Sequence, residues 1–450
     1  MRQKSLIQDF TSGSIPKQLF RFAMPLFLSS LLQVVYNMVD MIVVGQKMGD
    51  VGLSAVSVGG DVSNFLTFIA MGFSAAGQVI ISQYIGAGRR DKVGRFIATM
   101  FTALTVCAVV LSAVCIALRR PILNLMNTPA EAYTEALNYA TVCMLGMVFI
   151  YGYNIVSAVL RGIGDSKHPF LFISIAALLN IVLDLLFVMV FDMGAGGAAL
   201  ATVISQCVSF LACGVFLYQK RAELGLSFRL QEFLQPDKAM LGDLTKLGVP
   251  MAIKSASIHF SKLFVNSWIN SYGVEVSAFA GIANKLNSIS NLFSNATNTA
   301  GSSMVGQNIG AKTYSRVLKI ALTIAVAMFS VAAVLSLLLC LFPTQVFGLF
   351  TSEKAVLQIG REYLPIAVLI FFGSAARSPA NAILNGSGNY RVNFATAIFD
   401  GIIMRIGLSM LFGLGLNMTY LGFWLGDALA GFTPLVIGII FYLSGRWKRE

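Results

Sequence analysis

Residues 83–87 read Gln-Tyr-Ile-Gly-Ala, and residues 307–311, which lie 224 positions further along the chain, read Gln-Asn-Ile-Gly-Ala. Three further matches keep nearly the same offset: residues 160–164 with 384–388, Met24-Pro25 with Val249-Pro250, and Ser54-Ala55 with Ser277-Ala278. Four matches in one register indicate an internal repeat of about half the chain. The sequence therefore predicts two related halves.

The segments around these motifs are strongly apolar. Of the 450 residues, 56% are hydrophobic and 12% are charged, about half the ~25% charge of an ordinary soluble domain. Runs long enough to cross a bilayer, about 20 residues, fall near residues 17–45, 53–82, 96–118, 133–160, 168–191, 194–218, 244–270, 276–305, 314–341, 355–384, 392–415 and 418–444. These runs predict an all-α polytopic membrane protein with twelve transmembrane helices.

The number of spans in each half determines how the halves are oriented. Because each half holds six spans, both enter the membrane in the same direction, and we expect a pseudo-twofold axis along the membrane normal with a cleft between two six-helix lobes. We place the N-terminal lobe at residues 1–219, a polar cytoplasmic linker at 220–243 and the C-terminal lobe at 244–450. This architecture is typical of an alternating-access carrier.

Lys and Arg residues are distributed unequally between alternate connections. One side of the membrane receives 22 of the 32, and the other receives Lys47, Arg119, Arg120, Lys354 and Arg361. The positive-inside rule places the richer side, with both termini, in the cytoplasm. This distribution accounts for the net charge of +12 without a nucleic-acid partner. We expect a multi-pass protein of the plasma (inner) membrane, surrounded by membrane lipid.

Acidic residues lie inside the predicted spans of the first half, although a charge at mid-bilayer costs about 2.5–3.5 kcal/mol. Asp40, Asp184 and Thr202 all fall about 8–12 Å below the outer surface, at ~1.5 Å per residue, and Asn180 lies one turn from Asp184. Such oxygen ligands suit a proton or a sodium ion. The sequence predicts a coupling-cation site here, with a structural hydrogen-bond network as the alternative.

The second half does not repeat these acids. At comparable depth it carries Lys262, Arg405 and Asp427. We expect Arg405 and Asp427 to form an ion pair, which leaves no free carboxylate at this depth. Cation coupling is then expected in the first half alone.

Polar side chains at helical spacing predict the wall of a cavity. They form two stripes: Gln33, Tyr36 and Asn37 beside Asp40 in span 1, and Asn284, Asn287 and Asn291, continued by Asn295 and Asn298, in span 8. Residues three and four apart share a helix face, and lipid does not satisfy amides. The alternative is a polar seam between two helices.

Two pairs of equivalent residues predict moving parts. Asp61 and Lys285 are 224 residues apart, near the outer ends of spans 2 and 8, and we expect them to latch an outer gate; separate pairing within each half is the alternative. Pro25 and Pro250 occupy matching points of spans 1 and 7. Because proline removes a backbone hydrogen bond inside a helix, we expect both to act as hinges.

These motifs resemble the multidrug and toxic compound extrusion (MATE) family of the MOP exporter superfamily. The resemblance covers nearly the whole chain and is most specific from Pro25 to Gly49, at residues 83–88 and at residues 161–165. It is strongest to the DinF-like branch, in which the cation site lies in the N-terminal lobe. The matching positions are Asp40, Asn180, Asp184, Ala198 (through its carbonyl) and Thr202, and residues resembling those that line that lobe's cavity are Tyr36, Asn37, Tyr139 and Asn154.

The resemblance implies a secondary active exporter, not an enzyme, that exchanges small amphipathic and often cationic compounds for protons or sodium ions. We expect a monomer with drug-like small-molecule partners, no metal site and no cofactor besides the coupling ion. The alternative is a flippase for lipid-linked oligosaccharides of the same superfamily. The NorM-like branch carries acids in spans 7 and 10, where this chain has Lys254, Lys262 and Arg377, so neutral, zwitterionic and anionic substrates stay open.

Overall fold

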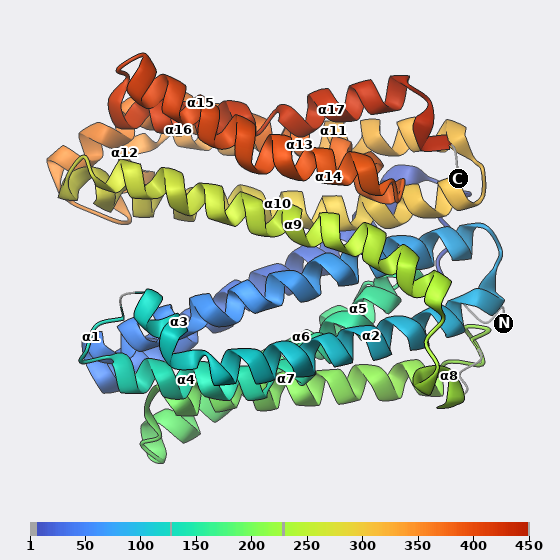
Figure 1. Cartoon of the computed structure of the whole chain (residues 1–450). Helices are drawn as coiled ribbons and strands as arrows, with labels where there is room; N and C mark the ends of the chain where they lie inside the picture. Colours follow the sequence, from blue (N-terminus) through green and yellow to red (C-terminus); the bar gives the residue numbers. More distant parts are fainter. Residues whose placement is uncertain (1–6, 127, 227–229, 449–450) are drawn as a thin grey trace. The chain divides into compact units, whose positions relative to one another are not determined.

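The computed structural model describes residues 7–126, 128–226 and 230–448, and these are almost entirely helical (Figure 1). The helices of the first half are α1 (Ile15–Gly86), α2 (Arg90–Ala117), α3 (Arg119–Leu125), α4 (Tyr133–Leu145), α5 (Met147–Gly162), α6 (Lys167–Asp184), the π-helix η1 (Leu185–Val190), α7 (Gly194–Gln219) and α8 (Leu230–Leu234). Four residues of the charge count lie outside the described residues: Arg2, Lys4, Arg229 and Arg449.

The second half follows the same order with more interruptions. Its helices are α9 (Lys238–Asn270), α10 (Val274–Gly310), α11 (Tyr314–Leu341), α12 (Pro343–Gly348), α13 (Lys354–Gly386), α14 (Tyr390–Ile398), α15 (Arg405–Met410), α16 (Thr419–Ala430) and α17 (Thr433–Leu443), with π-helices η2 (Phe399–Met404) and η3 (Leu411–Gly415) and the 3₁₀ turn η4 (Arg446–Lys448). Span 11 therefore runs through α14, η2, α15 and η3 as one interrupted helix.

The twelve predicted spans are present. Among the described residues, eight helices are long and apolar enough to cross a membrane, and the bent pair α4 and α5 makes a ninth. The 72 residues of α1 hold two spans, because the backbone turns at Gly49 (φ 62°, ψ −146°), a conformation that favours glycine. The remaining two spans are α9 and α10, which are 33 and 37 residues long but richer in polar residues.

The backbone reproduces the sequence repeat. Residues with positive φ recur at an offset of 224 or 225: Gly49 with Gly273, Gly88 with Lys312, Gly164 with Gly388, Asp192 with Asn417, and Gly194 with Thr419. Each pair lies at a turn that joins the same helices in the two halves. The two halves therefore follow one chain path.

A glycine also makes the same close helix contact in each half. A Cβ atom on Gly162 of α5 would lie 2.8 Å from Ile81 and 3.0 Å from the Gln78 carbonyl oxygen of α1. A Cβ atom on Gly386 of α13 would lie 2.8 Å from Val305 of α10. Because small residues let helices approach closely in a membrane, each of these crossings requires a glycine.

The chain folds as two compact units. Of the described residues, the first unit comprises residues 7–9 and 24–248, and the second comprises residues 10–23 and 249–448. The expected lobes differ from these units at two places, since residues 10–23 pack with the second unit and the expected linker packs with the first. The chain changes unit three times, after Asp9, Ala23 and Gly248, and the last two changes occur within two residues of a predicted hinge, Pro25 or Pro250.

Hydrogen bonds explain why the two segments pack as they do. The backbone N–H of Phe10 donates to Gln307 Oε1 at 3.0 Å, and Asn308 Nδ2 donates to the Phe10 carbonyl at 3.0 Å. In the linker, the Asp237 N–H donates to Thr99 Oγ1 of α2 at 3.1 Å. These long-range bonds were not visible as a pattern in the sequence.

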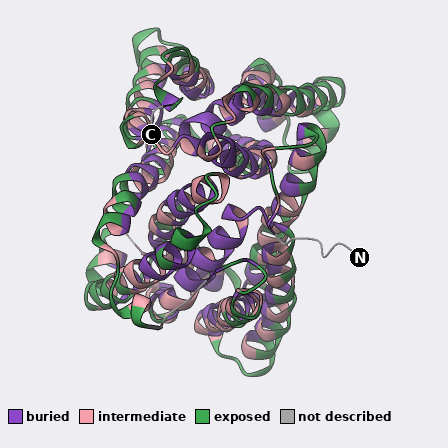
Figure 2. Cartoon of the chain, turned by 90° about the vertical axis from the view of Figure 1, so that its right-hand side faces the viewer, coloured by how far each residue is buried: buried purple, intermediate pink, exposed green. Residues whose placement is uncertain are grey.

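Exposed apolar side chains cover the outer faces of the spans. Leu178 of α6 is 68% exposed and Leu263 of α9 is 71% exposed. Figure 2 shows exposed residues in green and buried residues in purple on the same helices. Large exposed apolar surfaces mark membrane contact, so these faces are the lipid-facing ones.

Candidate cation site and the polar cavities

Three helices of the first unit bring the predicted cation residues together. Asp40 lies on α1, Asn180 and Asp184 lie one turn apart on α6, and Thr202 lies on α7. Residues four apart share a helix face, and α6 packs along α7. We call these four residues the acid cluster. Asp40 is 5% exposed and Asp184 is fully buried.

The acid cluster has unused oxygen atoms. The Asn180 amide donates to Thr202 Oγ1 at 3.4 Å, and the Asp40 carboxyl lies close enough to interact with Asp184 and Thr202. In the described part of the chain, no well-formed hydrogen bond reaches Asp40 Oδ1, Asn180 Oδ1 or either carboxyl oxygen of Asp184. These atoms are available to hold a proton or a cation.

Within the described ranges, the acid cluster has no basic side chain paired with it. Among the described residues, the ion pairs of the first unit lie elsewhere, and neither Asp40 nor Asp184 takes part in one. Burying two ionised carboxylates without a cationic partner is strongly unfavourable. The pair is therefore stable only with a bound proton or another cation.

The helix geometry changes at Asp184. This residue is the last one of α6, and the wider turns of η1 begin directly after it. Such π-helical segments occur frequently at functional sites. The second half carries η3 at nearly the equivalent place, but Leu408 stands there instead of an acid.

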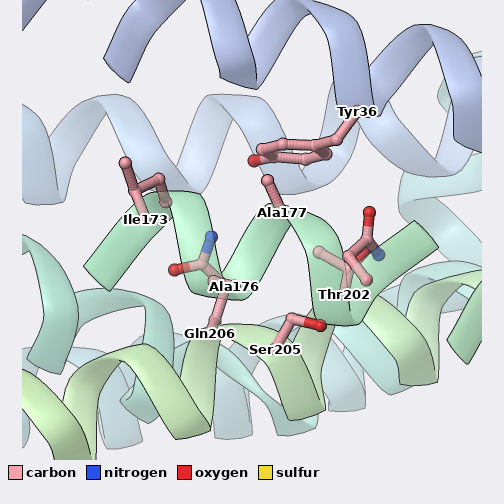
Figure 3. Close-up of a pocket in the computed structure, with 8 residues that line it drawn as sticks. Tyr36, Ile173, Ala176, Ala177, Thr202, Ser205 and Gln206 are labelled. Atoms are coloured by element: carbon pink, nitrogen blue, oxygen red, sulfur yellow. The ribbon is translucent and has the colours of Figure 1, made fainter. Parts of the chain in front are cut away.

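A small cavity adjoins the acid cluster. Its volume of about 10 Å³ has room for about one water molecule. Figure 3 shows the Tyr36 ring facing Ala177 of α6, with Ser205 and Gln206 projecting from α7. The complete lining consists of Tyr36, Ile173, Ala176, Ala177, Asn180, Thr202, Ser205 and Gln206.

Gln33, Asn37, Tyr139 and Asn154, which were predicted to line the substrate cavity, do not line this small cavity, and their substrate role stays a prediction. Gln33 is half-buried and Asn37 is exposed on α1. The Asn154 amide donates to the Ile150 carbonyl of its own helix at 2.9 Å. The spacing in the sequence identified the polar face of α1, and Asn154 of α5 was predicted from the family resemblance. The packing of α6 and α7 decides which residues line the small cavity.

Tyr139 and Ala198 are buried close to the acid cluster. The Tyr139 ring packs where a side chain on Gly59 of α1 would stand, and its hydroxyl interacts electrostatically with Asp40. Ala198 is fully buried on α7, one turn before Thr202. Both positions are compatible with the resemblance, and their roles stay predictions.

Ser205 and Gln206 are lining residues that the sequence interpretation missed. Together with Thr202 and Ser209 they continue one polar face of α7 at spacings of three and four. In the described residues, Ser205 Oγ, Gln206 Oε1 and Ser209 Oγ have no hydrogen-bond partner. This stripe in an otherwise apolar span was the signal that could have identified them.

A larger polar cavity lies inside the second unit. Its volume is about 40 Å³, and we call it the basic cavity. It is lined by Lys262 of α9, by Asn287, Ser290 and Asn291 of α10, by Ile370, Ser374 and Arg377 of α13, by Arg405 of α15 and by Asp427, Ala428 and Gly431 near α16. Arg405 and Asp427 form an ion pair.

The stripe of amides on α10 serves several purposes. Asn287 and Asn291 line the basic cavity, whereas Asn284 and Asn295 are exposed. Asn298 instead accepts a hydrogen bond from the Asn385 amide at 3.3 Å. The stripe is therefore part cavity wall and part helix–helix seam, because neighbouring helices cover only a portion of its face.

The predicted gate and hinge residues lie on helices of both halves. Asp61 is exposed on α1 and Lys285 is exposed on α10. Pro25 and Pro250 lie inside α1 and α9. The Ser29 hydroxyl donates to the Pro25 carbonyl at 2.8 Å. The gate and hinge roles themselves stay predictions.

The MatE family profile matches residues 25–186 and again residues 250–411. The chain belongs to the MatE family. The two matched segments start 225 residues apart and correspond to the two halves of the repeat. This is a family of transporters, so the MatE protein is a multispan transporter and not an enzyme.

Two proteins of Bacillus subtilis are similar to this MatE protein along nearly its full length. "Probable multidrug resistance protein YpnP" is 30% identical, and the match covers 98% of this chain and 97% of the relative. "Probable multidrug resistance protein YoeA" is 28% identical over 98% of this chain and 96% of the relative.

The fold of the MatE protein also matches solved structures. A multidrug resistance MATE family transporter of the MOP superfamily in an outward-facing conformation superposes with a TM-score of 0.90 at 22% identity, covering all of both chains. At this identity the similarity establishes the twelve-helix, two-lobe fold.

In the described part of the chain, no group of three or more His, Cys, Asp or Glu residues is arranged to hold a metal ion. The acid cluster contains two carboxylates, an amide and a hydroxyl.

Proposed function

We propose that this MatE protein is a secondary active multidrug exporter that exchanges small amphipathic molecules, cationic ones included, for protons or sodium ions. The relatives YpnP and YoeA are named as multidrug resistance proteins. The observation that carries the coupling is the pair Asp40 and Asp184, buried together with unused oxygens and without a basic partner.

The acid cluster supplies a way to couple cation entry to a change of conformation. When the site is empty, two buried carboxylates repel each other and lack their water shell. A bound proton or sodium ion removes this cost, so the loaded and empty sites favour different packings of α1 against α6 and α7. One charge that crosses 100 mV supplies ~2.3 kcal/mol, which corresponds to roughly fiftyfold in concentration.

The proposal also includes the membrane, the topology and the oligomeric state of the protein. We place it as a monomer in the plasma membrane with both termini in the cytoplasm, because Lys and Arg accumulate on that side. The acid cluster favours the DinF-like branch, since its residues lie in the first unit. Asp61 and Lys285 are proposed to latch the outer gate. The flippase alternative is not favoured, because YpnP and YoeA are both named as multidrug resistance proteins.

Accumulation of a cationic dye in inverted membrane vesicles, in which an exporter pumps from the medium into the lumen, tests the coupling. We expect an imposed proton or sodium gradient to drive dye transport by the native protein. Asp40→Asn or Asp184→Asn should reduce the gradient-driven rate by about tenfold or more, because each removes a charge interaction worth ~1.4 kcal/mol or more. The substitutions keep the shape of each side chain and remove its charge.

The matched control is Asp50→Asn, which removes an exposed carboxylate from the same helix. This variant should keep the native rate. Gradient-driven transport that survives both cluster substitutions would show that coupling occurs elsewhere.

A further inference from the structure

The basic residues that are assigned to neither membrane surface are confined to one half of the chain. The 27 Lys and Arg residues assigned to the two membrane surfaces leave five that are assigned to neither: Lys254, Lys262, Lys285, Arg377 and Arg405. All five belong to the second half. Of these, Lys285 is exposed on α10, and the other four lie near the buried carboxylate of Asp400 and the half-buried carboxylate of Asp427.

The two carboxylates neutralise the arginines. Arg377 pairs with Asp400 at 3.1 Å, and Arg405 pairs with Asp427 and lies 3.4 Å from Asp400. Arg405 is 2% exposed and Asp400 is fully buried. The negative charges of Asp400 and Asp427 are therefore both paired with arginines.

The two lysines are left without a carboxylate. Lys254 Nζ donates to the neutral amide oxygen of Asn381 at 2.7 Å. Within the described residues, Lys262 takes part in no ion pair. Because an uncompensated charge is costly away from water, the group has a surplus of positive charge that an anion would stabilise.

The basic cavity gives that anion a place. Lys262, Arg377 and Arg405 line it together with Asn287 and Asn291, so charged and neutral donors converge on one space. Its volume of about 40 Å³ has room for about three water molecules, which is the size of a carboxylate group and not of a whole drug-like molecule.

Several donors around this cavity are unused. In the described part of the chain, Arg377 Nε, Arg405 Nε and Ser374 Oγ are buried without a hydrogen-bond partner. Asp427 also lines the cavity, but its charge is compensated by Arg405. A purely structural ion-pair network would need neither the unpaired Lys262 nor these free donors.

We propose that the basic cavity binds a carboxylate group of the exported molecule, so that the substrates of this protein include anionic and zwitterionic amphiphiles. This inference rests on the export function proposed above and names its substrate class. The guanidinium groups and Lys262 hold the carboxylate through charge-assisted hydrogen bonds, and the rest of the molecule extends out of the small cavity.

A pair of dyes that differ only in this group tests the inference. We would measure the initial rates of export of a xanthene dye with a free carboxylate and of its methyl ester, in energised inverted vesicles. We expect Lys262→Gln to raise the KM for the carboxylate dye by about tenfold, the effect of losing one charge-assisted hydrogen bond. The KM for the ester should stay within about twofold of native, because it lacks the anionic group.

Two further variants separate binding from folding. Lys262→Arg keeps the positive charge and should retain export of the carboxylate dye. Lys319→Gln makes the same substitution at an exposed lysine of α11 and should behave as native with both dyes.

The other possible results contradict either the carboxylate site or the export function. Equal losses for both dyes in Lys262→Gln, or no loss for either, would overturn the carboxylate site. Export of the ester but not of the carboxylate dye by the native protein would overturn it while leaving the export function intact. Export of neither dye under proton or sodium gradients would overturn the export function, and the inference with it.

Discussion

At the scale of single residues, two features matter most: glycines that are small enough to let helices touch, and buried carboxylates that lack hydrogen-bond partners. Gly162 permits α5 to touch α1, and Gly386 makes the equivalent contact in the second half. Asp40 and Asp184 act in the opposite sense because, among the residues that the structure describes, Asp40 Oδ1 and both carboxyl oxygens of Asp184 are buried without a hydrogen-bond partner. The first kind of residue stabilises the fold, and the second kind prepares a site for an ion.

The close contact at Gly162 makes a prediction about stability. We expect Gly162→Ala to destabilise the protein by about 1–3 kcal/mol, the usual cost of overpacking, because its Cβ would press on Ile81 and on the Gln78 carbonyl. Gly214→Ala on α7 meets no atom within 4 Å and should be neutral or slightly stabilising. Thermal unfolding in detergent, followed by size-exclusion chromatography, distinguishes them. Equal unfolding temperatures would contradict the packing argument.

At the scale of helices, the prolines mark where a helix changes its neighbours. Helix α1 passes from the second unit to the first between Ala23 and Met24, and α9 passes from the first to the second between Gly248 and Val249. Pro25 and Pro250 follow directly. A missing backbone hydrogen bond at each point lets the two ends of the helix bend separately.

The hinge hypothesis predicts a loss of turnover. Pro25→Ala restores the backbone donor, which stabilises a straight α1 by up to about 3 kcal/mol. We expect kcat for dye efflux to fall by about tenfold while the Kd for the dye stays within twofold, since bending and binding involve different groups. Pro121→Ala in the short helix α3 is the control. Native turnover in Pro25→Ala would exclude bending at this residue.

How far sequence predicts these elements depends on the range of the interactions. Periodicity identified the spans, and spacing on α6 identified Asn180 and Asp184, because both are local properties. Ser205 and Gln206 were missed, since a short polar stripe does not show what packs against it. Asn284 and Asn287 looked equivalent, and only the packing of α10 against α13 separates them. Residues 10–23 pack with the second unit because of hydrogen bonds between residues that are almost 300 positions apart in the sequence.

At the scale of the whole molecule, the two halves share a backbone but carry opposite charges. The spans of the first half contain the acid cluster, and all five Lys and Arg residues assigned to neither membrane surface lie in the second half. The proposed functions follow this division, with the driving cation in the first unit and an anionic substrate group in the second. One fold thus provides two chemically different sites.

The distribution of charge also predicts the topology. Because the C-terminal tail belongs to the Lys-rich side, green fluorescent protein fused after the last residue should fluoresce. Alkaline phosphatase, which needs disulfides and therefore an oxidising compartment, should be active when inserted at Pro129, in the connection between α3 and α4. Activity of the phosphatase at the C-terminus, with none at Pro129, would reverse the orientation.

Lys312 adopts a left-handed backbone at the position where the first half has Gly88. A lysine is a poor choice for such a turn, so its presence reflects inheritance of the turn rather than local preference. Four turns kept at an offset of 224 or 225 residues point to duplication of an ancestral gene that encoded six spans. Once the two copies were fused into one polypeptide, their sequences could diverge, whereas the two chains of a homodimer must stay identical. One copy could then become acidic at its site while the other became basic.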